Sequence, residues 1–568
     1  MEEASNNNTE VFVYTEGVAV PQDVVRVRVH PSVTVIPDEA FHEQKMLEEV
    51  ELCEGLLEIG EQAFSKCKAL KRISVPSTVT IIHPYAFSNC DNLEELELFD
   101  GLQEIEQYAF FECNSLKRLT IPNTVRSIGG LAFCHSYTLQ HLQLPEGIES
   151  IGIYTFSHNR CPTIRIPPNF TTLTKSFIGT CRSMFSLELS EHATDIETDA
   201  LYESRRCRVL RNMALPPNAK VKQDAILRCT DLQQLFVTEE QITNALKHRF
   251  NNRHLLGSEE QLINALKHRF DNLPIHKMIY YQSYNNVTAD QLNNATDIRI
   301  SQRRSKLNPT GRQQDNLGMT PLHILACSSV QNIELYKVLV NKYPETLITK
   351  DRWGALPLLY AVWGNAPDEI VKFLAESYKS LYPDYELDWT EMVVTFGKAT
   401  AQEVIQKLLD IQKESFPDQR IDWDQVFDEL TKPNLHYFTK GNLSRVLRYL
   451  VKYSMAERIS ALGPRKWRDD MACKLEEGFS FFGGDSTPKG WFDGVSLKLS
   501  DYEIEYINLK EATTLIELTL WKNKIAENFQ EDGHINKRAK IDETDRRKEC
   551  RINCGADIVI EHVLPYLL

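Results

Sequence analysis

The sequence has few of the features that mark catalysis, export or membrane insertion. It contains no Gly-x-x-x-x-Gly-Lys-Ser/Thr or Gly-x-Gly-x-x-Gly phosphate loop, no His-Glu-x-x-His and no Gly-x-Ser-x-Gly elbow. No run of 18 apolar residues occurs, and the first residues lack the basic and apolar segments of a secretory signal. We therefore expect no catalytic residue, no cofactor and an intracellular protein, most simply cytoplasmic, with a nuclear location as the alternative.

Positive charge is also in deficit. The chain has 64 Lys and Arg against 79 Asp and Glu, a net charge of −15. Proteins that bind nucleic acid or anionic membranes need a basic face to meet the phosphates. The balance therefore argues against both as partners, and it fits a soluble chain that meets other proteins.

Disulfide and metal chemistry are not favoured either. The 13 cysteines are an odd number, no Cys-x-x-Cys pair occurs, and most cysteines fall at repeat positions typical of core residues. We expect reduced thiols in a reducing compartment and no metal site. At roughly 100–200 residues per domain, 568 residues predict three or four folding units.

What the sequence does have is repeats. The pair Ala-Phe recurs every 23 residues, at Ala40-Phe41, Ala63-Phe64, Ala86-Phe87, Ala109-Phe110 and Ala132-Phe133. The aromatic position continues at Phe156, again 23 residues on, and then less regularly at Phe177, Leu201 and Ile226. This predicts about nine copies of one unit, the last three degenerate.

Each copy contains a strand pattern such as Leu93-x-x-Leu96-x-Leu98. Alternate side chains of a strand point to one face, so one copy cannot bury its apolar edge alone. Stacked copies bury these edges in one continuous core, as in a solenoid. In four copies a cysteine follows the aromatic column by three residues, which predicts a core role without metal for Cys67, Cys90, Cys113 and Cys229.

These motifs resemble the BspA-like leucine-rich repeats over about residues 25–237, with residues 1–24 as an N-terminal cap. The resemblance implies a protein-recognition surface and carries over no catalytic residue. Outward-pointing strand residues would line a concave binding face, although a plain solvated sheet face explains them equally well. The candidates are Glu49, Glu51, Arg72, Ser74, Glu95, Glu97, Arg118, Thr120, His141, Gln143, Arg165 and Glu188.

A second duplication follows the repeats. Residues 239–250 (EEQITNALKHRF) and 259–270 (EEQLINALKHRF) have helical apolar spacing, which predicts an elbow or cap over 238–298. Their two histidines, His248 and His268, leave a zinc site as a minor alternative. The polar segment 299–316 is expected to be a linker, whose basic residues suit a solvated loop or, alternatively, a nuclear-import patch.

A different repeat begins with Thr320-Pro321-Leu322-His323 and has a weaker copy from Gly354 to Ala361. These residues resemble the ankyrin Thr-Pro-Leu-His box, which implies that His323 braces the neighbouring repeat. The pattern Pro-Asp-x-x-x-Asp-Trp recurs 34 residues apart, close to the ankyrin period. We expect helix pairs over 317–456, separate from the first array, with Asp388 and Asp422 as caps and Trp389 and Trp423 buried.

Residues 457–568 lose the period and suggest a mostly helical C-terminal region. The arrangement is similar to that of sets of diatom repeat proteins. The predicted fold is an α+β repeat protein: a leucine-rich-repeat β-solenoid, then an ankyrin-like α-helical solenoid and the C-terminal region. The predicted function is a protein–protein interaction scaffold with an unidentified protein partner. The alternative is an enzyme or small-molecule sensor with its site in 457–568.

Overall fold

A computed structural model describes residues 11–173, 183–193, 195–197, 200–201, 209–222, 225–226, 229–233, 253–301, 311–399, 402–431, 449–450 and 453–454. The chain divides into two compact units. The first joins Met1–Glu386 to Lys407–Phe416, and the second joins Leu387–Gln406 to Pro417–Leu568. Among the described helices, none has the length and apolar character needed to cross a membrane.

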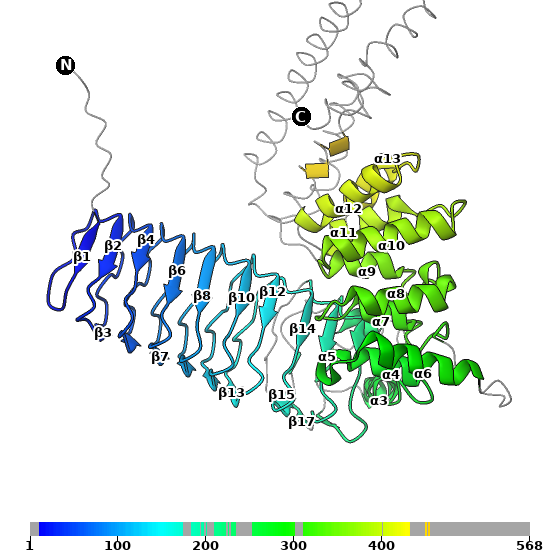
Figure 1. Cartoon of the computed structure of the whole chain (residues 1–568), viewed down its shortest axis with the longest axis horizontal. Helices are drawn as coiled ribbons and strands as arrows, with labels where there is room; N and C mark the ends of the chain where they lie inside the picture. Colours follow the sequence, from blue (N-terminus) through cyan, green and yellow to red (C-terminus); the bar gives the residue numbers. More distant parts are fainter. Residues whose placement is uncertain are drawn as a thin grey trace, which may run out of the picture. The chain divides into compact units, whose positions relative to one another are not determined.

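The N-terminal part is a β-solenoid of leucine-rich-repeat type, with about eight turns, close to the nine predicted (Figure 1). The strands form two series, and the pairings within each series are parallel. The first series is β1 (Phe12–Tyr14), β2 (Arg26–Val29), β4 (Glu49–Glu51), β6 (Arg72–Val75), β8 (Glu95–Leu98), β10 (Arg118–Thr120), β12 (His141–Gln143), β14 (Thr163–Arg165), β16 (Ser186–Glu188) and β18 (Asn212–Met213). The second is β3 (Val35–Ile36), β5 (Glu58–Ile59), β7 (Ile81–Ile82), β9 (Glu104–Ile105), β11 (Ser127–Ile128), β13 (Ser150–Ile151), β15 (Thr172–Leu173), β17 (Asp195–Ile196) and β19 (Lys220–Val221).

The aromatic column forms the spine of the core. Phe64, Phe87 and Phe110 are fully buried, and each ring stacks on the next with centroids 5.1 Å apart and planes nearly parallel. The stack extends to Phe41 at one end and Phe156 at the other. The 23-residue register predicted from the sequence is therefore confirmed, because Arg72 pairs with Glu95 across one turn.

The column cysteines also lie in the core. The thiol of Cys67 donates to the carbonyl of Phe41 at 3.1 Å, and that of Cys90 to Phe64 at 3.3 Å. Each thiol thus ties its turn to the preceding one. Burial raises the pKa of Cys67 to about 12, so the group stays a neutral thiol. In the described part of the chain, no cluster of His, Cys, Asp or Glu could hold a metal ion.

Two further columns have left-handed backbone, which the sequence did not predict. At these positions φ lies between 54° and 64° in residues other than glycine, a conformation that costs about 1–3 kcal/mol. Hydrogen bonds between turns hold it, as from the Tyr85 amide to the Gln107 carbonyl at 3.1 Å. The columns are Glu39, Gln62, Tyr85, Tyr108, Leu131 and Tyr154, and Glu43, Lys66, Asn89, Glu112, His135 and His158.

Short helices follow the solenoid. The second copy of the predicted duplication lies largely in α3, whereas the first copy, 239–250, lies outside the described residues. In this segment His268 contacts Asp271, and no metal-binding group forms around it among the described residues. The helices are α1 (Thr230–Gln233), α3 (Arg253–Lys267), α4 (Pro274–Tyr280), α5 (Gln282–Asn285) and α6 (Ala289–Ser301).

Helix pairs then stack on one another, α7 against α9 and α8 against α10. The Thr320 and His323 side chains form a capping box at the start of α7, and His323 Nε2 lies 3.2 Å from the Ala355 carbonyl in the next pair. His323 therefore joins neighbouring pairs. The elements are α7 (Pro321–Ala326), α8 (Ile333–Lys342), the 3-10 helix η1 (Pro344–Leu347), α9 (Pro357–Trp363), α10 (Asp368–Leu381) and α12 (Gln402–Ser415).

In the second unit, α11 (Trp389–Ala399) packs against α13 (Trp423–Thr431). The carboxylates of Asp388 and Asp422 accept from the amides three residues on, at 2.9 and 3.0 Å, which confirms both as helix caps. Each cap precedes a buried tryptophan at the first position of its helix, so Trp389 and Trp423 have corresponding places.

Candidate protein-binding face

The candidate face is formed by outward-pointing residues of the first strand series. Leu96 points into the core between the exposed side chains of Glu95 and Glu97, as strand alternation requires. The structure leaves eight of the predicted residues exposed: Glu51, Arg72, Ser74, Glu95, Glu97, Arg118, Thr120 and Gln143. Three are half-buried, namely Glu49, His141 and Arg165, and one, Glu188, is buried.

Charge on this face alternates from strand to strand. Residues 47–52 (LEEVEL) recur 46 residues later as 93–98 (LEELEL), and 70–75 (LKRISV) recur as 116–121 (LKRLTI). The unit is therefore a pair of turns, a signal present in the sequence but hidden by the 23-residue period. Five charged bands result: Arg26 and Arg28 on β2; Glu48, Glu49 and Glu51 at β4; Lys71 and Arg72 at β6; Glu94, Glu95 and Glu97 at β8; and Lys117 and Arg118 at β10.

Some of these charges pair across neighbouring strands. Arg28 donates to Glu51, a bond that holds the pKa of that carboxyl below its usual range. Lys71 lies 2.8 Å from Glu48. Exposed ion pairs of this kind stabilise the fold by at most about 1 kcal/mol each. Stability alone therefore does not account for the alternation of charge along the face.

The same face is covered from β14 onward. The Arg165 guanidinium lies 4.3 Å over the Tyr284 ring and donates to the Ser283 carbonyl at 3.3 Å. On the same strand, Thr163 donates to the Cys327 carbonyl at 3.2 Å. The expectation that the helix pairs form an array separate from the first is thus wrong for residues 317–386, which belong to the same compact unit.

Glu188 is the clearest correction to the predicted face. Its carboxylate accepts from the Ser329 amide at 2.8 Å, from the Ser329 hydroxyl at 2.7 Å and from the Ser283 hydroxyl at 3.2 Å. The side chain is 1% exposed, and burial raises its pKa. Glu188 therefore binds the chain's own helices and is closed to any partner.

The boundary between the free and covered parts lies at β12. The Asn365 amide lies 3.0 Å from His141 Nε2, and that amide can donate to a neutral ring. Burial, together with the positive charges of Arg118 and Lys407, lowers the pKa of His141. The ring is therefore neutral at pH 7, in agreement with the hydrogen bond.

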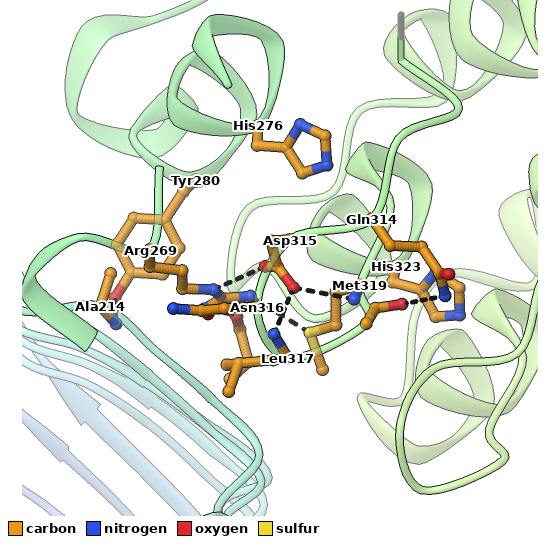
Figure 2. Close-up of polar contacts among 12 residues, drawn as sticks. Ala214, Arg269, His276, Tyr280, Gln314, Asp315, Asn316, Leu317, Met319 and His323 are labelled. Carbon is orange, nitrogen blue, oxygen red and sulfur yellow. Dashed lines mark hydrogen bonds and ion pairs between the residues drawn. The ribbon is translucent and has the colours of Figure 1, made fainter. Parts of the chain in front are cut away.

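A buried ion pair lies at the centre of the junction (Figure 2). Arg269 donates to Asp315 at 2.7 Å, and both side chains are completely buried. The same guanidinium donates to the Asn212 side chain at 2.7 Å and to the Met213 carbonyl on β18 at 3.1 Å. One side chain thus connects the last strand of the first series to the loop before α7.

A second arginine joins the last turn to the helix pairs. Arg211 is bonded to Asp231 at 2.7 Å, and its guanidinium lies 5.3 Å from the ring centroid of Trp353 and 5.4 Å from that of Trp363. The Phe185 ring lies tilted against the Trp363 ring, with the centroids 4.9 Å apart. These contacts are aromatic and desolvated, unlike the polar surface of the free strands.

Residues 23–140 and 127–257 match the family described as the BspA type leucine rich repeat region, in six copies. Among solved structures, the chain is similar to the pneumococcal vaccine antigen PcpA, with 21% identity and a TM-score of 0.27. That match covers 37% of this chain and 55% of the antigen, so it spans about half of that protein's length.

Two further solved structures are leucine-rich-repeat proteins of other bacteria. The one from Bacteroides ovatus has 21% identity and a TM-score of 0.31, covering 39% of this chain and 73% of that one. The one from T. pallidum has 23% identity and a TM-score of 0.23, covering 31% of this chain and 72% of that one. No curated protein matches the chain.

Proposed function

We propose, on the premise that residues 23–257 are a BspA-type leucine-rich-repeat array, that the chain is a protein-interaction scaffold. The contact surface is the free strand face, which we define as the outward residues of β2, β4, β6, β8 and β10. The observation that carries the proposal is the division of one strand face into two parts. From β14 onward the chain's own helices cover it, whereas Arg72 and Glu95 stay 65% and 68% exposed.

The covered strands illustrate what this kind of surface can bind. Side chains and loops from residues 283–365 reach it with hydrogen bonds, a cation–π contact and a ring contact. A protein partner on the free strands would use the same chemistry, with charged pairs at the rim and few apolar anchors. The bands alternate in sign and the chain has a net charge of −15, so the proposed partner is a protein and neither a nucleic acid nor a membrane.

We also infer that the helix pairs from residue 317 are ankyrin-like. The Thr320–His323 capping box and the contact from His323 to the Ala355 carbonyl support this. The proposed scaffold is intracellular, most simply cytoplasmic, and contains leucine-rich repeats followed by ankyrin-like helix pairs. The alternative function, an enzyme or sensor, has its site in 457–568, which lies outside the described residues. Residues 302–310 of the basic linker also lie outside them.

A matched capture experiment tests the proposal. The intact chain, a face variant (Arg72→Ala, Glu95→Ala, Arg118→Ala) and a control with the same charge changes off the strands (Lys68→Ala, Asp91→Ala, Arg126→Ala) are used as bait, with quantitative mass spectrometry. We expect the face variant alone to lose its specific partners by at least about tenfold, the effect of roughly 1.4 kcal/mol. Equal capture by all three baits would contradict the proposal.

A further inference from the structure

One line of charged side chains crosses the free strand face at right angles to its strands. Arg26 pairs with Glu49 in the parallel register, and Glu49 pairs with Arg72. Arg72 pairs in turn with Glu95, and Arg118 follows 23 residues later in the sequence. The sign of the charge therefore reverses at every strand. We call these residues the charged line: Arg26, Glu49, Arg72, Glu95 and Arg118.

The charged line is little used within the chain, although each charge has a neighbour of opposite sign. Arg72 and Glu95 approach to just 4.0 Å, and their side chains stay 65% and 68% exposed. In the part of the chain that the structure describes, the side chains of Arg26, Glu49 and Arg118 make no hydrogen bond or ion pair. These charges are therefore available to a partner whose own charges alternate at the same spacing.

The spacing of the line matches an α-helix better than an extended strand. The phenylalanine rings beneath it, from Phe41 to Phe110, lie 4.8 to 5.1 Å apart, and successive planes differ by only 3–4°. The strands above them form a nearly straight row (Figure 1). A helix repeats one face about every 5.4 Å, and a strand about every 6.6 Å. From β2 to β10 a helix drifts from the line by about 1–2 Å and an extended strand by about 6 Å.

We propose that the free strand face binds a charged α-helix that lies along the charged line, across the strands. The side chains of this helix alternate in sign from turn to turn: acidic over β2, β6 and β10, and basic over β4 and β8. The distance from β2 to β10 requires a helix about 20 Å long, or about 14 residues. The widths also agree, because strands of three or four residues are about 10–13 Å long and a helix is about 10–12 Å wide.

Such a helix stays within the open part of the face. It ends over β10, before Asn365 reaches His141 on β12 and before the contacts of residues 283–327 with β14. The order of the charges also restricts its position. A shift by one turn brings like charges together at every strand, and a shift by two turns loses two of the five contacts.

Two synthetic peptides of equal composition test the inference, which rests on the proposed function because it names a partner for the same face. Both are Ala-rich and end-capped, with Glu, Lys, Glu, Lys and Glu in that order. In the helical peptide the charges follow one another by four and three residues in turn. In the alternate-residue peptide they lie two residues apart, as an extended partner would need.

Fluorescence anisotropy of the labelled peptides measures their binding to the intact chain. At about 20 mM salt the helical peptide should bind at least about tenfold more tightly than the alternate-residue peptide, and its dissociation constant should rise at least about tenfold at about 500 mM salt. Equal affinities, tighter binding of the alternate-residue peptide or no binding of either would overturn the inference. If the face variant still loses its captured partners in that case, the proposed function stands and only the helix fails.

Charge reversal on one strand checks the alignment. Glu95→Lys with Glu97→Lys makes β8 basic and should weaken binding of the helical peptide at least about tenfold. A third peptide, with Glu in place of the second Lys, should bind this variant more tightly than the helical peptide does. The control Glu39→Lys with Glu61→Lys changes the net charge equally, away from the charged line, and should bind like the parent. The same change in affinity with both variants would overturn the alignment.

Discussion

The strand face of the solenoid has two parts, one covered by the chain's own helices and one exposed. On β14, β16 and β18 it is closed by the chain's own helices through Arg165, Glu188 and the Arg269–Asp315 pair. On β2 to β10 it carries exposed charges that alternate from strand to strand. The backbone geometry is the same in both parts, so the difference lies in the side chains. Buried ions and aromatic rings fix a permanent contact, and exposed charges suit a reversible one.

The covered part should be the more sensitive to loss of one charged group. Arg269→Ala removes one partner of a fully buried pair and leaves Asp315 uncompensated, which we expect to cost about 3–5 kcal/mol of unfolding free energy. Urea denaturation measures it, with Arg269→Met plus Asp315→Leu as the comparison. The double variant should recover much of the loss. An Arg269→Ala variant as stable as the parent would show that the buried ion pair does not stabilise the junction.

The core under the free strands should be as well packed as the junction. Phe87→Ala empties one place in the aromatic column, for which we expect about 3–5 kcal/mol, as for other large-to-small core changes. A thermal melt of the variant that matches the parent would show that the solenoid does not depend on the stack. Such a result would make the free region a looser structure than the covered one.

Glu188 should make the covered part sensitive to pH. Its pKa is raised in the folded state, so its contribution to stability is fully present below the unfolded pKa of about 4.3 and is lost as pH rises through the folded value. Glu188→Gln keeps the shape and removes the charge. We expect parent and variant to be closest in stability near pH 4 and the parent to become less stable than the variant toward pH 8. If the unfolding free energies of parent and variant changed in parallel from pH 4 to pH 8, Glu188 would not carry a buried charge.

The free face should contribute least to stability. Arg72→Ala and Glu95→Ala remove a pair that is 4.0 Å apart and mostly exposed, so each change should alter the unfolding free energy by less than about 0.5 kcal/mol. Chemical denaturation at low and high salt measures this change in unfolding free energy. A loss above about 1 kcal/mol would mean that the charged bands serve mainly to hold neighbouring turns together.

Local patterns predicted the solenoid well, because its contacts repeat at a constant sequence distance. Phe64 and Phe87 occupy equivalent positions in successive turns, so the 23-residue register predicts the place of each ring. Asp388 and Asp422 cap helices through hydrogen bonds to residues only three positions along the chain. The junction could not be found in this way. Arg269 meets Asp315 across 46 residues, and Glu188 meets Ser329 across 141, and neither distance recurs. Eleven of the twelve candidate face residues retain some exposure, but the helices that bury Glu188 come from a repeat expected to stand apart.

The central claim is that one strand face is open at its first strands and closed at its last. Cysteine substitutions Ser74→Cys and Thr120→Cys on the open part and Ser186→Cys on the closed part test it directly. Maleimide labelling of the native chain, resolved by peptide mass spectrometry, should modify the first two about as fast as in urea and leave position 186 at least about tenfold slower. Equal native labelling at all three positions would contradict the account.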